Sequence, residues 1–301
     1  MTTVACVGIA VMDLMFRVDA LPAGGGKLYA DAYQEISGGV AANAAVAIAR
    51  LGGKARYIGR VGDDPMGQRI VAELQAAGVD ADRTQTMRGV PSPVSAVLVD
   101  RTGERSIINF TPAELFSGGD LGPAGDLNGV DGVLVDVRWP DAAARALAAA
   151  AAAGIPGVFD FDRPMDAAGE VLLTTASHVA ISHSALLATS GSSDPETGLG
   201  RLAERTEAWL AVTTGEHGVY WRADGRTHHL PAFPVEVVDT VAAGDVFHGA
   251  LALTLAEGQS ESDAVRFASA TAALKCTQPG GRAGSPSRSE VEVLLEAATG
   301  P

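Results

Sequence analysis

The chain has 301 residues, enough for one large domain with a substantial core. Hydrophobic residues make up 47% of it, and 36 glycines with long alanine runs favour close-packed helices against a sheet over disorder. The formal net charge of −14 argues against nucleic acid as a partner, because binding a polyanion requires a basic face. A small anionic substrate is still compatible with this charge if a few Lys or Arg side chains converge locally.

No segment has the pattern of a secretion signal or a membrane span. The opening residues, MTTVACVGIAVMDLM, have no basic leader, and Asp13 interrupts a short apolar run, so we expect a strand there. The Ala-rich segment 141–153 carries a charged residue and ends at a glycine, which favours a packed helix. Cys6 and Cys276 lie in apolar or small-residue settings that do not indicate a disulfide framework. We expect a cytoplasmic protein that does not contact a membrane.

Apolar runs of strand length alternate with helical segments along most of the chain. This alternation is typical of an α/β fold in which helices cover both faces of a mostly parallel sheet. Ligands of such sheets gather at the carboxyl ends of the strands. The predicted strands lie near residues 4–11, 54–62, 132–138, 155–162, 178–182 and 209–215.

Two segments, 14–36 and 91–111, do not fit this alternation. Both have the pattern of short strands with turns, and the second predicts a hairpin through residues 101–103. We expect them to form a small sheet over one end of the main domain. The core would then comprise residues 1–13, 37–90 and 112–301.

The segment DTVAAGDVFHGALA, residues 239–252, carries the clearest chemical pattern. Small residues at 242–244 allow backbone N–H groups to converge at the start of the following helix, where the helix dipole adds positive potential, so the turn predicts an anion hole. Asp245 would be ionised near neutral pH and could accept a proton from an alcohol while the hole holds phosphoryl charge. Phosphoryl transfer to a hydroxyl needs these groups. The alternative is an ordinary N-capped helix entered through a small-residue turn.

The sequence resembles the ribokinase-like (PfkB) carbohydrate kinases over nearly its whole length. Further landmarks follow in the family's order, from Asp13 and the pair at 38–39 to IGRVGDDPMG at 58–67 and VTTGEHG at 212–218. The resemblance implies a ribokinase-like three-layer fold with a mostly parallel central sheet and a small β-sheet lid. The family's signature, D-T-x-G-A-G-D followed by F and a small-residue helix, is matched by Asp239, Thr240, Ala243, Gly244, Asp245 and Phe247.

The resemblance also implies roles by position. Asp245 would be the catalytic base, and the segments 14–36 and 91–111 would form a lid that closes over the sugar and excludes water. ATP and Mg²⁺ are the implied cofactors, and a monovalent cation is left open. The remaining roles are the anion hole at Ala242, Ala243 and Gly244, sugar contacts from Asp13, Gly39 and Asn43, ATP contacts from Thr213, Gly215 and Gly218, and an adenine-side stretch, LKCTQPGGRAG, that includes Lys275 and Gly280.

Two departures from the family pattern bear on function. The usual glycine at 242 is an alanine after Val241; Ala242 keeps its N–H, so a hole is still expected on condition that the turn needs no positive φ there. The family's N-x-x-E segment, linked to the metal, should follow residues 178–182, but SHSALL contains no Glu. Asp160 and Asp162, at the end of a predicted strand, are candidates for placing magnesium, and capping a loop is their alternative role.

Within the family, the sequence is most similar to bacterial sulfofructose kinases, with ketohexokinases next. In such kinases a Lys, an Asn and an Arg hold the sulfonate of 6-deoxy-6-sulfofructose, and Lys27, Asn109 and Arg138 stand in matching settings. An acidic protein needs such focused cations to attract an anion. The alternatives are a solvated Lys27, and an Arg138 that pairs with Asp136 or Asp141.

We therefore predict an ATP-dependent kinase for the 1-hydroxyl of a ketose, with 6-deoxy-6-sulfofructose as the first candidate. Fructose, another ketohexose and fructose 6-phosphate are the alternative substrates. A sugar-binding regulator without turnover is the non-enzyme alternative, suggested by Val241, Ala242 and the missing Glu. Exposed edges and apolar faces of the lid strands predict a homodimer formed through the lid.

Overall fold

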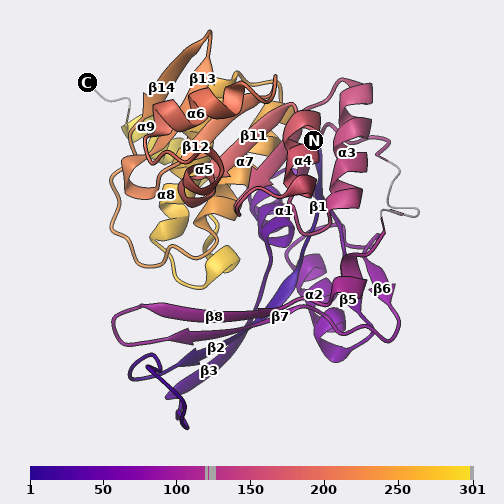
Figure 1. Cartoon of the computed structure of the whole chain (residues 1–301), viewed down its shortest axis with the longest axis vertical. Helices are drawn as coiled ribbons and strands as arrows, with labels where there is room; N and C mark the ends of the chain where they lie inside the picture. Colours follow the sequence, from indigo (N-terminus) through magenta and orange to yellow (C-terminus); the bar gives the residue numbers. More distant parts are fainter. Residues whose placement is uncertain (119–120, 122–126, 299–301) are drawn as a thin grey trace.

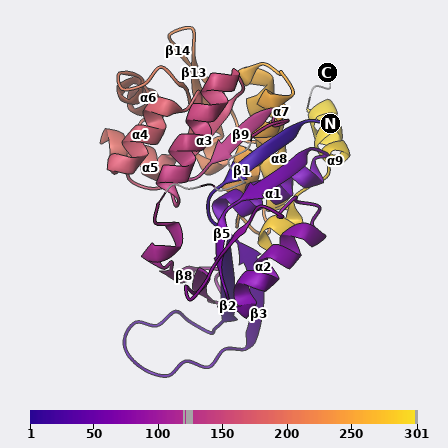
Figure 2. The same cartoon turned by 90° about the vertical axis from the view of Figure 1, so that its right-hand side faces the viewer.

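We describe the protein in a computed structural model that covers residues 1–118, 121 and 127–298. An eight-stranded sheet forms the middle of three layers, in the order β14-β13-β12-β11-β10-β9-β1-β4 (Figures 1 and 2). All neighbours from β4 to β12 pair in parallel, and β13 and β14 continue the sheet antiparallel. The strands are β1 (Thr3–Val7), β4 (Lys54–Ile58), β9 (Gly132–Val135), β10 (Gly157–Phe161), β11 (His178–Ser182), β12 (Trp209–Thr213), β13 (Val219–Ala223) and β14 (Arg226–Leu230).

Helices cover both faces of this sheet, so its central strands are apolar along their whole length. β9 and β10 are buried at every residue, as expected for parallel strands between two helical layers. One core lies between the sheet and α1 (Val40–Arg50), α7 (Ala243–Ala256) and α8 (Glu261–Cys276), with α2 (Pro65–Ala76) and α9 (Arg288–Ala297) at its margin. The other core lies under α3 (Pro140–Ala153), α4 (Ala167–Thr175), α5 (His183–Ser190) and α6 (Pro195–Ala203).

The predicted α/β fold is confirmed, although every predicted strand except 178–182 is shorter in the structure. The segment 54–62 divides into β4 and β5 (Arg60–Gly62), which pairs with β6 (Gln85–Met87). The chain bends at Gly59, where a side chain would overlap the hydroxyl of Tyr57. Among the described helices, none combines the length and apolar character needed to cross a bilayer.

A second, four-stranded sheet projects from one end of the main body (Figure 1). We call it the small sheet; its order is β3-β2-β7-β8. The predicted hairpin is present between β7 and β8, where Asp100 Oδ1 accepts hydrogen bonds from the backbone N–H groups of Thr102 (2.8 Å) and Glu104 (3.1 Å). Its strands are β2 (Val11–Arg17), β3 (Ala32–Gly38), β7 (Val94–Val99) and β8 (Arg105–Phe110).

Candidate active site

The root of the small sheet leads directly into α1 through two glycines. Gly39 has a φ of 102°, and a Cβ there would lie 2.5 Å from Ile9 O, so only glycine fits this turn. The buried carboxylate of Asp136 accepts hydrogen bonds from the N–H groups of Ile9 (2.8 Å) and Ala41 (3.2 Å). These contacts fix the start of α1, and with it the position of Asn43 in its first turn.

Asn43 and Asp245 meet where α1 and α7 begin. Asn43 Nδ2 donates to Asp245 Oδ2 at 2.7 Å, although the residues are 202 positions apart. The Asn43 side chain is buried, and its Oδ1 has no hydrogen-bond partner among the described residues. An unsatisfied buried acceptor beside a carboxylate is a site where a ligand hydroxyl could donate.

The environment of Asp245 raises its pKa to about 7. The main cause is burial, which disfavours the charged form, followed by the nearby Asp160 carboxyl; the hydrogen bond from Asn43 and the nearby His248 act in the opposite direction. Burial of the side chain thus opposes the full ionisation at neutral pH that the sequence predicted for Asp245. A pKa near the working pH suits a general base.

A second ionisable pair lies one helical turn beyond Asp245. His248 Nδ1 is 2.7 Å from Asp160 Oδ2, and both side chains are almost fully buried. Burial alone would lower the pKa of His248, but Asp160 outweighs it and the pKa is raised. Asp160 thus has a close histidine partner within the core, one helical turn from Asp245.

The turn that enters α7 has an unexpected backbone conformation. Ala242, the N-cap residue of α7, has a φ of 61° and a ψ of 10°, in the left-handed region. The condition that this turn needs no positive φ is therefore not met, and Ala242 carries a strain of about 1–2 kcal/mol that glycine would avoid. Ala243 N–H donates to Thr240 O at 3.2 Å, while Gly244 lies exposed at the start of the helix.

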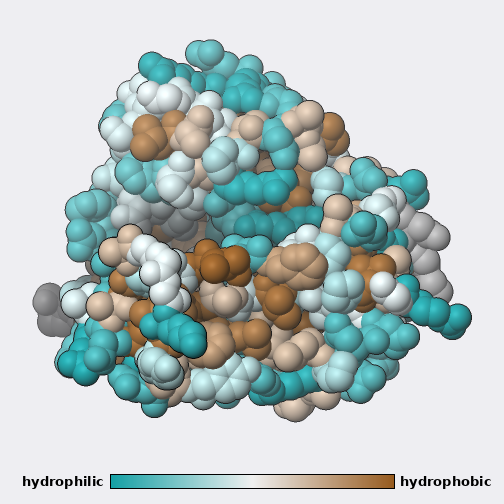
Figure 3. Space-filling view, turned by 60° about the horizontal axis from the view of Figure 1, so that its bottom comes forward, coloured by the Kyte–Doolittle hydropathy of each residue, from teal (hydrophilic) through white to brown (hydrophobic). Residues whose placement is uncertain are grey.

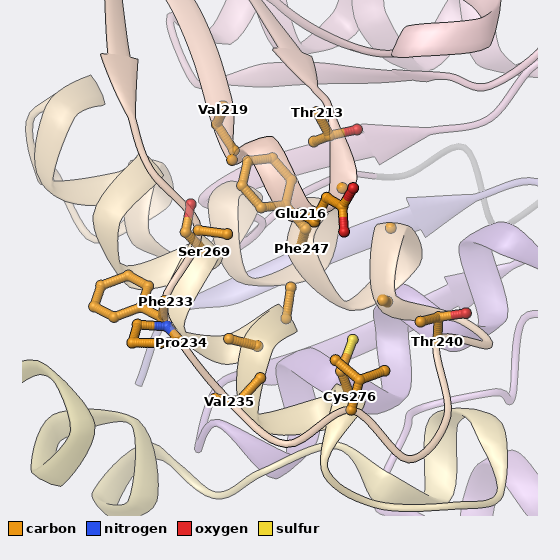
Figure 4. Close-up of a pocket in the computed structure, with 18 residues that line it drawn as sticks. Thr213, Glu216, Val219, Phe233, Pro234, Val235, Thr240, Phe247, Ser269 and Cys276 are labelled. Carbon is orange, nitrogen blue, oxygen red and sulfur yellow. The ribbon is translucent and has the colours of Figure 1, made fainter.

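A pocket of about 860 Å³ opens beside this turn (Figure 4). Thr213, Gly215 and Gly218, predicted to contact ATP, line one wall, and Ala243 and Gly244 border it as well. Gly218 is required by packing, because a side chain there would overlap the backbone of residues 230–232. The predicted ATP residues and part of the predicted anion hole therefore share one cavity.

Lys275 and Gly280, predicted to lie beside the adenine, do not line this pocket. Lys275 Nζ is buried and donates to Asp239 O at 2.7 Å, and the N–H of Gly280 donates to Asp239 Oδ2 at 3.1 Å. Both residues thus hold the start of the signature segment. From the same stretch it is Cys276, at the end of α8, that reaches the pocket.

Two of the predicted sugar contacts share one face of the small sheet. Asp13 on β2 lies opposite Ser95 on β7, which lies opposite Asn109 on β8, so the three residues form a row across neighbouring strands. Asp13 also lies against the chain at Gly38, where an added Cβ would be 2.5 Å from its Oδ2. Burial raises the pKa of Asp13, and its hydrogen bond with Ser95 acts in the opposite direction.

Arg138 and Lys27 are not brought together by any contact. The guanidinium of Arg138, after β9, holds Asp162 with both terminal nitrogens, one of them at 2.7 Å, and only the backbone N–H of Arg138 donates to Asp136 (Oδ1, 2.8 Å). Lys27 lies exposed in the loop between β2 and β3 and makes no hydrogen bond or ion pair within the described ranges.

The two residues predicted to place magnesium, Asp160 and Asp162, each already have a side-chain partner. Asp162 is held by the guanidinium of Arg138, and Asp160 faces the imidazole of His248. Among the residues that the structure describes, no three or more His, Cys, Asp and Glu side chains form a metal-binding group.

The sequence matches the family of pfkB family carbohydrate kinases over residues 1–288, and the chain belongs to this family. It is 31% identical to a ribokinase of Bacillus subtilis over 98% of this chain and 100% of that protein, and 34% identical to a fructokinase of Klebsiella pneumoniae over 79% and 81%. A candidate ribokinase from Agrobacterium tumefaciens, 38% identical, superimposes with a TM-score of 0.94 over 100% of this chain and 99% of that one. Ribokinase of Arabidopsis thaliana, in a structure with ribose and ATP, is 25% identical with a TM-score of 0.87 over 98% of each chain.

Sequence reasoning missed one wall of the pocket. Ser269, Ala272, Ala273 and Cys276 on α8 line it, and Ser269 Oγ is buried without a hydrogen-bond partner among the described residues. Their spacing of i, i+3, i+4 and i+7 places them on one helix face. A stripe of small residues at this spacing was the available signal.

Proposed function

We propose that this carbohydrate kinase transfers the γ-phosphoryl group of ATP to a hydroxyl of a small sugar, with Asp245 as the general base. The observation that carries the proposal is the placement of Asp245: it has a pKa of about 7, receives a hydrogen bond from Asn43, and follows a helix-entry turn that borders the pocket. As the sugar oxygen forms its bond to phosphorus, the bond from phosphorus to the departing ADP oxygen breaks. The hydroxyl proton passes to the Asp245 carboxylate.

The pocket of Figure 4 is the proposed nucleotide site. It is lined mostly by apolar and small residues, with Ser269 as a buried polar group that could meet the adenine. Gly215 has a φ of 60° and begins a short turn where the backbone can approach phosphates closely. The likeness to an ATP-bound ribokinase structure from Arabidopsis thaliana supports the same assignment.

The sugar would lie between the small sheet and the start of α1. Asp13 and Asn109 face it from the sheet, and Asn43 faces it from the helix, with its free Oδ1 ready to accept from a hydroxyl. In this role the small sheet, our proposed lid over residues 14–36 and 91–111, excludes water from the reacting groups. Gly39 contributes by permitting the close turn that orients Asn43.

Magnesium is expected with ATP, where it would neutralise phosphate charge. Of the two carboxylates predicted to place it, Asp160 faces His248 and Asp162 is held by Arg138.

For the substrate, 6-deoxy-6-sulfofructose, phosphorylated at its 1-hydroxyl, is the proposed candidate. Its support is the row of Asp13 and Asn109 across the small sheet and the guanidinium of Arg138, which remains partly exposed beyond the carboxyl end of β9. A neutral sugar such as ribose or fructose is a second candidate. The Arg138–Asp162 pair supports this second candidate, because Asp162 already neutralises the positive charge of Arg138 that a sulfonate would need.

We further propose a cytoplasmic homodimer. The face of the small sheet opposite to Asp13 carries Tyr33, Ile108 and Phe110, each more than half exposed. Figure 3, which brings this end of the molecule forward, shows hydrophobic side chains gathered there. Free cysteines at 6 and 276 are compatible with a reducing compartment.

The test is ADP release from Mg²⁺-ATP with sulfofructose, fructose 6-phosphate, fructose and ribose offered separately. Asp245→Asn should lower kcat by about 10²–10⁴-fold, because the proton acceptor is lost. A sulfofructose preference that Arg138→Ala abolishes would support the sulfonate assignment, whereas a preference for ribose or fructose would replace it. Sugar binding without ADP formation would identify a regulator and overturn the kinase assignment.

A further inference from the structure

Lys275 places a charged group in the interior of the protein, against backbone oxygens. Lys275 is the residue before the last of α8, and its side chain is fully buried, with Nζ 2.7 Å from Asp239 O and 3.4 Å from Gln278 O. Asp239 Oδ2 lies 3.5 Å from the same nitrogen. Two carbonyl oxygens and a carboxylate oxygen form the kind of cluster that binds a hard cation, and here the lysine ammonium occupies it.

The carboxylate of Asp239 connects three parts of the molecule. Its Oδ1 accepts from Val241 N–H at 3.0 Å and from Arg105, on β8 of the small sheet, at 3.0 Å. Its Oδ2 accepts from Gly280 N–H at 3.1 Å and Gly281 N–H at 3.3 Å. Asp239 thus joins the α7 entry turn, the C-terminal loop and the small sheet, and the Lys275 ammonium contacts Asp239 from the interior.

Burial of a lysine ammonium costs free energy unless its partners compensate for the lost hydration. Burial lowers the pKa of Lys275, and Asp239 acts in the opposite direction; the other ionisable neighbours are Cys276 and Arg105. A methionine would fill the same space without this cost. The positive charge of Lys275 is therefore better explained by its contacts with Asp239 than by packing.

Lys275 holds Asp239, which leads into the turn at residues 241–245 before the base. Asp239 fixes Val241 N–H, and Ala242 follows with its φ of 61° before α7 begins at Ala243. Asp245 lies two residues further along the helix. A shift of Asp239 would thus move the strained turn and the base together.

We propose that Lys275 is a positioning residue that serves as a built-in monovalent cation, holding Asp239 so that the turn at residues 241–245 keeps its catalytic shape. The inference rests on the proposed function of that turn. It follows that turnover by this kinase requires no added K⁺ or NH₄⁺.

The experiment compares wild type, Lys275→Ala and Lys275→Met with tetramethylammonium as the only monovalent cation, and then with K⁺ or NH₄⁺ at equal ionic strength. Wild type should change less than twofold. Lys275→Ala, which empties the oxygen cluster, should lose at least tenfold in kcat and recover most of it in K⁺ or NH₄⁺. Lys275→Met fills the space with an apolar chain, so it should lose activity and stay low in every salt.

A second readout does not depend on catalysis. The thermal midpoint of Lys275→Ala should rise in K⁺ or NH₄⁺ relative to tetramethylammonium, while wild type and Lys54→Ala, which alters an exposed lysine on β4, should show no such difference. Folding of Lys275→Ala only in the presence of a small cation would count as the same result.

Three results would overturn the inference: a wild type that needs K⁺, a fully active Lys275→Met, or a Lys275→Ala that no small cation restores in either readout. Absence of turnover in wild type with every sugar would instead refute the proposed function. The thermal measurement would then still decide whether the cluster binds a cation.

Discussion

The hydrogen bond from Asn43 to Asp245 gives a prediction about pH. A base with a pKa of about 7 should make kcat/KM rise with pH and level off above pH 7, because only the carboxylate can accept the proton. Asn43 donates to that carboxylate and so stabilises the ionised form. In Asn43→Ala the pKa should rise by about one unit, since a hydrogen bond to a charged group is worth roughly 1.5 kcal/mol and one unit is about 1.4 kcal/mol.

The measurement is the pH profile of kcat/KM between pH 5.5 and 9 for wild type and Asn43→Ala. Loss of a sugar contact alone would lower the whole profile by the same factor, so the shift of the acid limb is the diagnostic part. Asp245→Asn is the control and should show no acid limb. An unchanged midpoint in Asn43→Ala would mean that the Asn43 hydrogen bond does not set the pKa of the base.

At the scale of elements, the entry turn of α7 holds a residue that its conformation disfavours. Ala242→Gly should stabilise the protein by about 0.5–1 kcal/mol, because relief of the 1–2 kcal/mol left-handed strain exceeds the added entropy of glycine in the unfolded chain. Urea unfolding followed by circular dichroism measures this. The matched control is Ala243→Gly, one residue on, where φ is not positive and glycine should destabilise by about 0.5–1 kcal/mol. Equal changes in both variants would contradict the role of strain.

The elements themselves were largely predictable from the sequence, and several contacts within the site were not. Alternating apolar runs predicted the parallel sheet, and the irregular segments predicted the small sheet. The partner of Arg138 was not predicted, because the pair forms between the ends of two parallel strands and depends on their register. The family resemblance places Lys275 near the adenine, but the packing of its side chain decides that its ammonium faces Asp239.

At the scale of the whole molecule, one polar contact near the site joins the small sheet to the signature segment. Arg105 on β8 reaches Asp239 in the main body, so the small sheet and the signature segment share one carboxylate. Asp239 therefore contacts the proposed lid and also orients the turn before Asp245. This arrangement would link closure over the sugar to assembly of the catalytic groups.

The outer face of the small sheet gives the last prediction, a dimer in solution. Ile108 is 68% exposed and lies with Phe110 on the face away from Asp13, on an edge strand that could pair with a second copy. Light scattering coupled to size-exclusion chromatography should give twice the chain mass for wild type. Ile108→Glu should give the single-chain mass, because association would bury an unpaired charge. Val293→Glu changes a residue on α9 of similar exposure, 65%, and should remain dimeric. A monomeric wild type, or dissociation by both substitutions alike, would rule out this face as the interface.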